Sequence, residues 1–241
     1  MIPVVLLMAL PASPAEPAAG LEDLLSRPIA LVAALALVSL LPFAFMTVTA
    51  FVKIATVLQI VRSAIGAQGV PSSTVIMALA GVLTVVAMAP VGDKIAARAA
   101  PLLERGTRDT VTLVREGVAA VREPLREFLL ANASDVERAR FLDVARKART
   151  ASGAATADVA PDDLTVLLPS FVVTELGEAF AVGFLIYLPF LVIDLVVSNV
   201  LLALGMQMMS PTQVSMPFKL LLFVAVDGWA LLARSLIEGY R

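Results

Sequence analysis

The sequence predicts an all-α protein of the integral membrane type, in which long apolar helical hairpins, broken by prolines and glycines, flank a polar helical insert. Apolar residues make up 59% of the 241 residues and charged residues only 16%, with a mean hydropathy of +0.92. Soluble domains are closer to half apolar and a quarter charged. Residues 93–163 hold 12 acidic and 12 basic side chains, so most of the charge lies in one segment.

The N-terminal residues 1–20 are interpreted as either a signal peptide or a tail. Residues 3–10 form a short apolar run, which is followed by small residues and prolines, as at a signal cleavage site. The positive charge that normally precedes such a run is missing. Both interpretations stay open.

The first apolar region, residues 21–92, is expected to form a helical hairpin. Residues 29–52 carry no charge over 24 positions, which is long enough to cross a bilayer. Pro42 lies inside this run and predicts a kink or break near Leu41. Gly66 and Pro71 predict the turn of the hairpin, after which Ser72 or Ser73 is a suitable N-cap for a second apolar run.

The polar insert, residues 93–163, is expected to contain two or three amphipathic helices outside the hydrocarbon, with a break at Pro124. Its end, residues 150–163, has the composition of a linker. The second apolar region, residues 164–241, begins with a 46-residue block that is long enough for two half or full passes. A further apolar block, residues 214–236, follows it.

Helix breaks inside apolar blocks indicate how these blocks are covered. Irregular backbone is not tolerated in contact with lipid, so it must be covered by protein or line an aqueous path. This favours a multi-subunit assembly, and simple proline-kinked spans are the alternative. The predicted helix breaks are Pro42, Gly66, Pro71, Pro189, Gly205, Pro211 and Pro217.

Charged side chains inside the apolar blocks are costly, by about 2.5–3.5 kcal/mol at a bilayer centre even on lenient scales. Three interpretations are open: ion pairs between helices or subunits, charges at the membrane border, or a proton or ion relay. Glu175 and Glu178 share one helix face, and Lys219 and Asp227 roughly share another. The seven residues concerned are Lys53, Arg62, Glu175, Glu178, Asp194, Lys219 and Asp227.

The composition gives little support for an enzyme or for a protein that binds a metal or a nucleotide. The chain has no cysteine and no histidine, which removes thiolate ligands and the commonest metal ligand and general base. It has no phosphate-binding loop of the G-x-x-x-x-G-K-[ST] kind. We therefore expect no catalytic residues, no metal and no cofactor. The net charge of −2, without a basic block, makes nucleic acid an unsuitable partner.

A methionine-rich segment is the most unusual local feature. Met206, Met208 and Met209 fall within four residues, between Gly205 and the helix-ending pair Ser210-Pro211. Methionine is flexible and polarisable, so a ring of such loops can form a soft, dry seal. Packing between helices is the alternative interpretation.

Three long stretches, residues 51–90, 167–206 and 210–236, together resemble the FliP/SctR family of type III secretion export-gate subunits. Their sequence is more similar to the injectisome branch of that family than to the flagellar branch. The resemblance implies a homopentamer that forms a helical ring with SctS-like and SctT-like subunits and further export-apparatus proteins. It also implies an assembly at the bacterial inner membrane, raised toward the periplasm. The methionine segment then corresponds to a gasket that closes the pore, although Gln207 interrupts the run of methionines usual in the family.

The expected function is therefore a passive conduit for unfolded secreted proteins rather than an enzyme. A flagellar export-gate subunit is one alternative. A secondary transporter or ion channel that uses Glu175, Glu178 and Asp194 is another.

Overall fold

The computed structural model describes residues 28–67, 69–104, 110–151 and 159–240, and within these ranges the regular structure is entirely α-helical. The expected fold class is thus confirmed. The predicted signal peptide or tail at residues 1–20 lies outside the described residues, as do residues 152–158 of the predicted linker. The chain divides into two compact units, Met1–Leu41 and Pro42–Arg241.

The boundary between the units falls inside α2 (Pro28–Val48), a helix that continues through Pro42. Of the kink or break expected near Leu41, the break is wrong, because one proline removes one hydrogen bond without having to end a helix. The end comes instead at Thr49, whose hydroxyl donates to the Phe45 carbonyl and accepts from the Phe51 amide. This side chain competes with the backbone for its hydrogen bonds, and the chain bends by 71° into α3 (Phe51–Ile65).

The α3–α4 hairpin is closed by local turn chemistry. Gly66 takes the left-handed conformation (φ 73°) that a helix end often needs and that glycine adopts at little cost. The Ser72 hydroxyl accepts from the Val75 amide and caps α4 (Ser73–Ala87). Arg62 reaches across the turn, where its Nε donates to the Pro71 carbonyl at 2.7 Å and its Nη1 to Ser73 Oγ at 2.8 Å.

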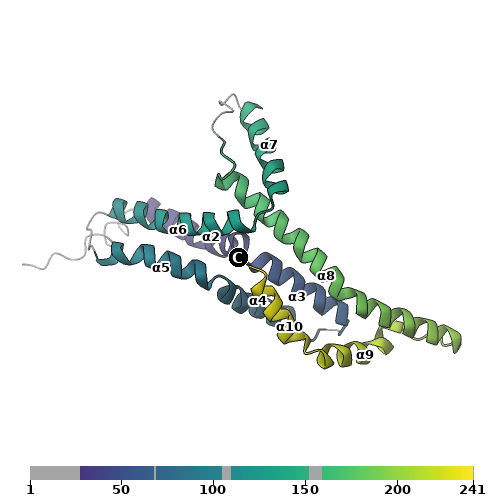
Figure 1. The fold of residues 1–241 in the computed structure, drawn as a ribbon. Coiled ribbons are helices and arrows are strands. Elements are labelled where there is room, and N and C mark those ends of the chain that lie inside the picture. The colour runs from purple at the N-terminus through teal and green to yellow at the C-terminus, as the bar shows by residue number, and fades with distance from the viewer. Residues whose placement is uncertain (1–27, 68, 105–109, 152–158, 241) are drawn as a thin grey trace, which may run out of the picture. The chain divides into compact units, whose positions relative to one another are not determined.

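The polar insert contains three helices in the described ranges: α5 (Ala89–Glu104), α6 (Thr110–Asn132) and α7 (Asp135–Ala151). α5 begins before the charged segment, after a 56° bend from α4, so the change in composition at residue 93 lies inside a helix. α6 continues through Pro124, so the break predicted there is wrong. α5 and α6 lie side by side, and α7 packs against the beginning of α8 (Figure 1).

The second apolar region begins with a single helix, α8 (Leu164–Ala203), of 40 residues. The two passes predicted for this block, and the break at Pro189, are wrong. A proline costs a helix interior about 3 kcal/mol, which the hydrogen bonds of so long a helix and its packing against α3 outweigh. At 1.5 Å per residue α8 is about 60 Å long, roughly twice the hydrocarbon thickness of a bilayer.

Two short helices, α9 (Pro211–Ala225) and α10 (Gly228–Glu238), complete the chain. Pro211 occupies the first turn of α9, where its missing N–H has no partner to lose. Pro217 lies inside α9, so the break predicted there is wrong. The break comes at Asp227, a non-glycine residue with φ of 49°, and α9 and α10 are bent by 59°.

The packing forms two apolar clusters. The larger one centres on α3, which lies along α8 (Figure 1) and also packs against α4. α3 and α8 approach each other closely, since a Cβ built on Gly183 of α8 would stand 2.4 Å from Cδ1 of Ile60 on α3. The smaller cluster joins α5 and α6 to the beginning of α8, where the Phe128 and Phe171 rings meet edge to face at 5.5 Å.

Among the described helices, α8 is long and apolar enough to cross a membrane. Three bent pairs reach the same length and composition if each is counted as one broken span: the end of α2 with α3, α4 with α5, and α9 with α10. This is the composition of a helical membrane protein with interrupted spans.

Candidate functional site

A buried charge cluster joins α3 to α8. Lys53 Nζ lies 2.9 Å from Glu175 Oε1 and 2.7 Å from Glu178 Oε2. The side chains of Lys53 and Glu175 are only 9% and 1% exposed, whereas Glu178 is 57% exposed. The two carboxylates share a face because they are three residues apart on a helix. Together they hold one lysine, so the cluster carries a formal charge of −1.

Tyr240 completes this cluster from the C-terminal end of the chain. Its hydroxyl donates to Glu175 and lies 3.1 Å from the Ala50 carbonyl oxygen, and Lys53 Nζ is 4.6 Å from the centroid of its ring. Burial, reinforced by the neighbouring Glu175 carboxylate, raises the pKa of the Tyr240 phenol. The phenol is therefore a hydrogen-bond donor throughout the physiological range. Sequence patterns did not single out Tyr240, because a lone aromatic residue near a chain end carries no periodic signal.

A second pair, with a buried lysine and a partly exposed carboxylate, fastens α9 to α8 and α3. Lys219 Nζ lies 2.7 Å from Asp194 Oδ2 and donates to the Ala64 carbonyl at 3.1 Å. Ser215, one turn earlier on α9, donates to the other Asp194 oxygen. A lysine with a carboxylate and a carbonyl as acceptors is well satisfied in a low-dielectric site. Ser215 was not among the predicted site residues either.

Arg62 and Asp227 are not drawn into these clusters. Arg62 is half-buried and donates to the hairpin turn, without a carboxylate partner in the part of the chain that the structure describes. Asp227 is exposed at the α9–α10 break. Lys219 and Asp227 were expected to share a helix face. This prediction is wrong, because α9 ends at Ala225 and Asp227 has left-handed backbone outside the helix.

The methionine segment forms the connection between α8 and α9. Gly205 (φ 74°) ends α8 in a Schellman motif, in which the Met206 amide donates to the Leu201 carbonyl at 2.9 Å and the Gly205 amide to the Leu202 carbonyl at 3.0 Å. The Ser210 carbonyl accepts from the Gln213 and Val214 amides in the first turn of α9. The segment is thus short and held at both ends.

The methionine side chains are exposed to different degrees. Met208 is 100% exposed, and Met206 and Met209 are exposed by 42% and 44%. Gln207 is exposed as well. Apolar side chains that are exposed at a fixed place, rather than folded back onto the protein, indicate a surface that another molecule covers.

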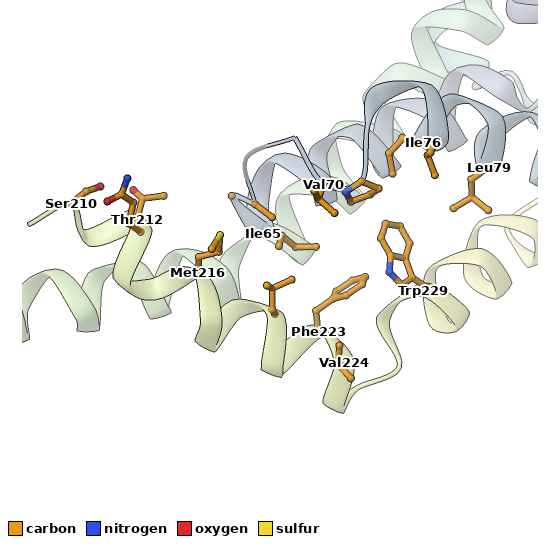
Figure 2. A pocket seen from close by; sticks show the side chains of 16 residues that line it. Ile65, Val70, Ile76, Leu79, Ser210, Thr212, Met216, Phe223, Val224 and Trp229 are labelled. Atoms are coloured by element: carbon orange, nitrogen blue, oxygen red, sulfur yellow. The ribbon is translucent and has the colours of Figure 1, made fainter.

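An apolar groove of about 1010 Å³ lies between the α3–α4 hairpin and the α9–α10 pair. Figure 2 shows Ile65, Val70 and Ile76 on one wall and Phe223 and Trp229 on the other. Ser210, Thr212 and Gln213 form a polar end next to the methionine segment. No cluster of carboxylates in the described ranges has the geometry of a metal site.

Comparison with known proteins decides what these features belong to. The FliP family profile matches residues 34–236. The chain belongs to the FliP family. Two relatives of this FliP-family chain are the "Hypersensitivity response secretion protein HrcR" of Ralstonia nicotianae and the "Yop proteins translocation protein R" of Yersinia pestis. The first is 43% identical over 85% of this chain and 93% of its own. The second is 41% identical over 88% and 96%, respectively.

A flagellar relative is also similar. The "Flagellar biosynthetic protein FliP" of Caulobacter vibrioides is 38% identical over 92% of this chain and 79% of its own. The expected family membership is therefore confirmed, and the identities favour the injectisome branch. The relatives of this FliP-family chain are membrane-embedded components of type III secretion export apparatus, and the family is one of apparatus subunits rather than known enzymes.

Proposed function

We propose that the chain is the pore-forming core subunit of a type III secretion export apparatus. It conducts unfolded protein substrates across the region of the bacterial inner membrane, and it catalyses no reaction. Several copies, five by the family resemblance, surround one axis together with SctS-like and SctT-like subunits and further export-apparatus proteins. The ring stands raised toward the periplasm.

The observation that carries this proposal is the exposed methionine segment held between two fixed helix ends. A loop anchored by the Schellman motif at Gly205 and by the start of α9 at Ser210 presents its side chains at a set position. In a ring of copies these loops meet at the axis. Thioether side chains then close the channel by soft contact, and they yield to a passing chain without breaking hydrogen bonds.

Exposed apolar surface supports the assembly. α8 exposes large side chains such as Phe180, Phe184 and Leu185 along its length, and its length of about 60 Å exceeds the thickness of the hydrocarbon. Part of this surface must then be covered by protein. The groove in Figure 2 is a second such surface, which we assign to a neighbouring copy because its lining reaches Ser210, the residue that directly follows the methionine segment.

The buried charges support a structural role over the relay that a transporter would need. Glu175 and Asp194 are each paired with a lysine at under 3 Å, and each has a hydroxyl donor as well. Such paired groups fix helices relative to one another. A relay needs carboxylates that exchange protons with water.

Leak of small solutes tests the gasket. Replacing Met206, Met208 and Met209 together by Ala removes the bulk of the seal, so idle apparatus should let small solutes pass while the chain still assembles. The matched control replaces two methionines elsewhere, Met46 and Met77, by Ala. Equal permeability of the triple variant, the control and the wild type, with assembly intact, would refute the gasket.

A further inference from the structure

Tyr240 lies between the two apolar clusters of the fold. It follows the end of α10, where its amide donates to the Ile237 carbonyl at 3.3 Å. Its side chain packs against both apolar clusters, the larger one around α3 and the smaller one that joins the polar insert to α8. Among the described residues only Met88, at the bend between α4 and α5, does the same.

The hydroxyl of Tyr240 contacts the apolar part of the fold, at α8 and at the start of α3. It donates to Glu175, whose side chain is 1% exposed, and stands 3.1 Å from the carbonyl oxygen of Ala50. Ala50 is the residue from which α3 starts after the 71° bend. Its carbonyl otherwise accepts only a long bond of 3.3 Å from the Ile54 amide. The phenol thus lies between the first turn of α3 and a buried carboxylate of α8.

The ring of Tyr240 acts on the polar insert. It stacks on Phe128 of α6 with ring centroids 5.9 Å apart and an interplanar angle of 27°. Phe128 in turn meets Phe171 of α8 edge to face. Aromatic pairs of this kind contribute beyond the area that they bury. The Tyr240 ring also makes a cation–π contact with the Lys53 ammonium, whose nitrogen lies 4.6 Å from the ring centroid.

We propose that Tyr240 is a positioning residue that joins the polar insert and the buried charge cluster through two separate contacts. Its hydroxyl orients Glu175, and through Glu175 it orients Lys53, while its ring holds α6. The two halves of the side chain therefore serve two different parts of the fold. The two contacts act independently, so each can be removed without the other. This joining role does not depend on whether the methionine segment seals a pore.

Separate removal of the two halves tests the joining role in the assembled, detergent-solubilised complex by hydrogen exchange. Tyr240→Phe keeps the stack and removes the donor, so amides at the start of α3 should exchange about tenfold faster, as expected for the loss of one buried hydrogen bond. The amides of α6 should stay as protected as in the wild type. Phe128→Leu keeps the donor, and it should speed exchange in α6 about fivefold without affecting the start of α3.

Tyr187→Phe is the matched control. Tyr187 is the only other tyrosine of the chain, is half-buried against the same α3 cluster, and its hydroxyl has no partner in the ranges that the structure describes. If Tyr240→Phe changes exchange no more than Tyr187→Phe, the hydroxyl has no positioning role. Equal loosening of α3 and α6 by both Tyr240→Phe and Phe128→Leu would also overturn the proposal, because it would reveal general packing alone.

A double-mutant cycle separates action through Glu175 from a direct structural effect. If the hydroxyl acts through Glu175, Tyr240→Phe should add less than twofold to exchange at the start of α3 once Glu175→Ala is present, since their common interaction is already lost. Full additivity of the two substitutions would contradict action through Glu175. Amine acylation gives an independent readout, because Lys53 should become more reactive in Tyr240→Phe but not in Tyr187→Phe.

Discussion

The apolar helices and the polar insert use ion pairs of the same chemistry in opposite surroundings. Lys53 and Glu175 are buried between α3 and α8, with side chains 9% and 1% exposed. Lys94 and Glu127 join α5 to α6 at the same distance of 2.9 Å, but they are 57% and 46% exposed. Equal distances therefore do not mean equal importance for stability.

The difference lies in what remains when one partner is removed. A buried carboxylate that loses its lysine keeps its charge in a low-dielectric site, which costs far more than the pair itself contributes. An exposed carboxylate is solvated at once, and water screens the pair while it exists. The apolar part of the fold should thus depend on single charges, and the insert should not.

The largest effect is expected from Lys53→Met. It leaves Glu175 buried with only the Tyr240 hydroxyl as a donor, so the chain should lose about 3–5 kcal/mol of folding stability. The amount of assembled complex, measured by blue native electrophoresis of solubilised membranes, should fall severely. Lys94→Met is the matched control at an exposed pair, and an equal loss in both variants would contradict the comparison.

A smaller effect is expected from Lys219→Met. Its partner Asp194 is 31% exposed and keeps the Ser215 donor, so part of the charge remains solvated and bonded. The loss should be about 2–3 kcal/mol, visible as a lower melting temperature than wild type but a higher one than Lys53→Met. The reverse order of the two variants would show that exposure does not set the cost.

Close packing, rather than charge, is tested by Gly183→Val. A Cβ at this position would stand 2.4 Å from Ile60 Cδ1 and 3.2 Å from Ile60 Cβ, so a larger side chain must push α3 and α8 apart. We expect a loss of about 1–3 kcal/mol and a lower melting temperature, with partial recovery when Ile60→Ala is added. Gly177→Val, on the same helix with open space around it, is the control. Equal effects at both glycines would argue against a close α3–α8 contact.

The smallest effect is expected in the insert. The hydrogen bond and charge of Lys94 hold the pKa of Glu127 below its usual range. The folded state therefore gains stability from Glu127 above the pKa of the unfolded carboxyl and loses it as the pH falls through the lower, folded value. Because Glu127 is solvent-exposed, the wild type and Glu127→Gln should melt alike at neutral pH and differ little even in acid. A strong acid-dependent difference between them would place this pair among the structurally essential ones.

Local sequence rules predicted the helix ends that depend on one or two residues. Gly66 and Ser72 close the hairpin and Gly205 precedes the methionine segment because left-handed backbone and hydroxyl caps are local requirements. The same rules failed at Pro42 and Pro189, where helix continuity is set by many cooperative hydrogen bonds and by packing against other helices. Proline content alone does not measure these contributions.

The charged residues of the site were predictable, but most of their partners were not. Costly charges in apolar blocks are visible in a sequence, and Glu175 and Glu178 share a face by spacing. Which lysine meets them depends on how α3 packs along α8, which no local pattern contains. Tyr240 and Ser215 were missed for the same reason, since their partners are distant in sequence.

Cross-linking at Met208 tests the central claim most directly. The chain contains no cysteine, so Met208→Cys introduces its only thiol, at a fully exposed position of the methionine segment. If copies surround an axis that these segments close, mild oxidation of the intact complex should link pairs of chains. Val144→Cys, exposed on α7, should give no such product. An intact complex in which Met208→Cys stays monomeric and as readily alkylated as Val144→Cys would contradict the pore.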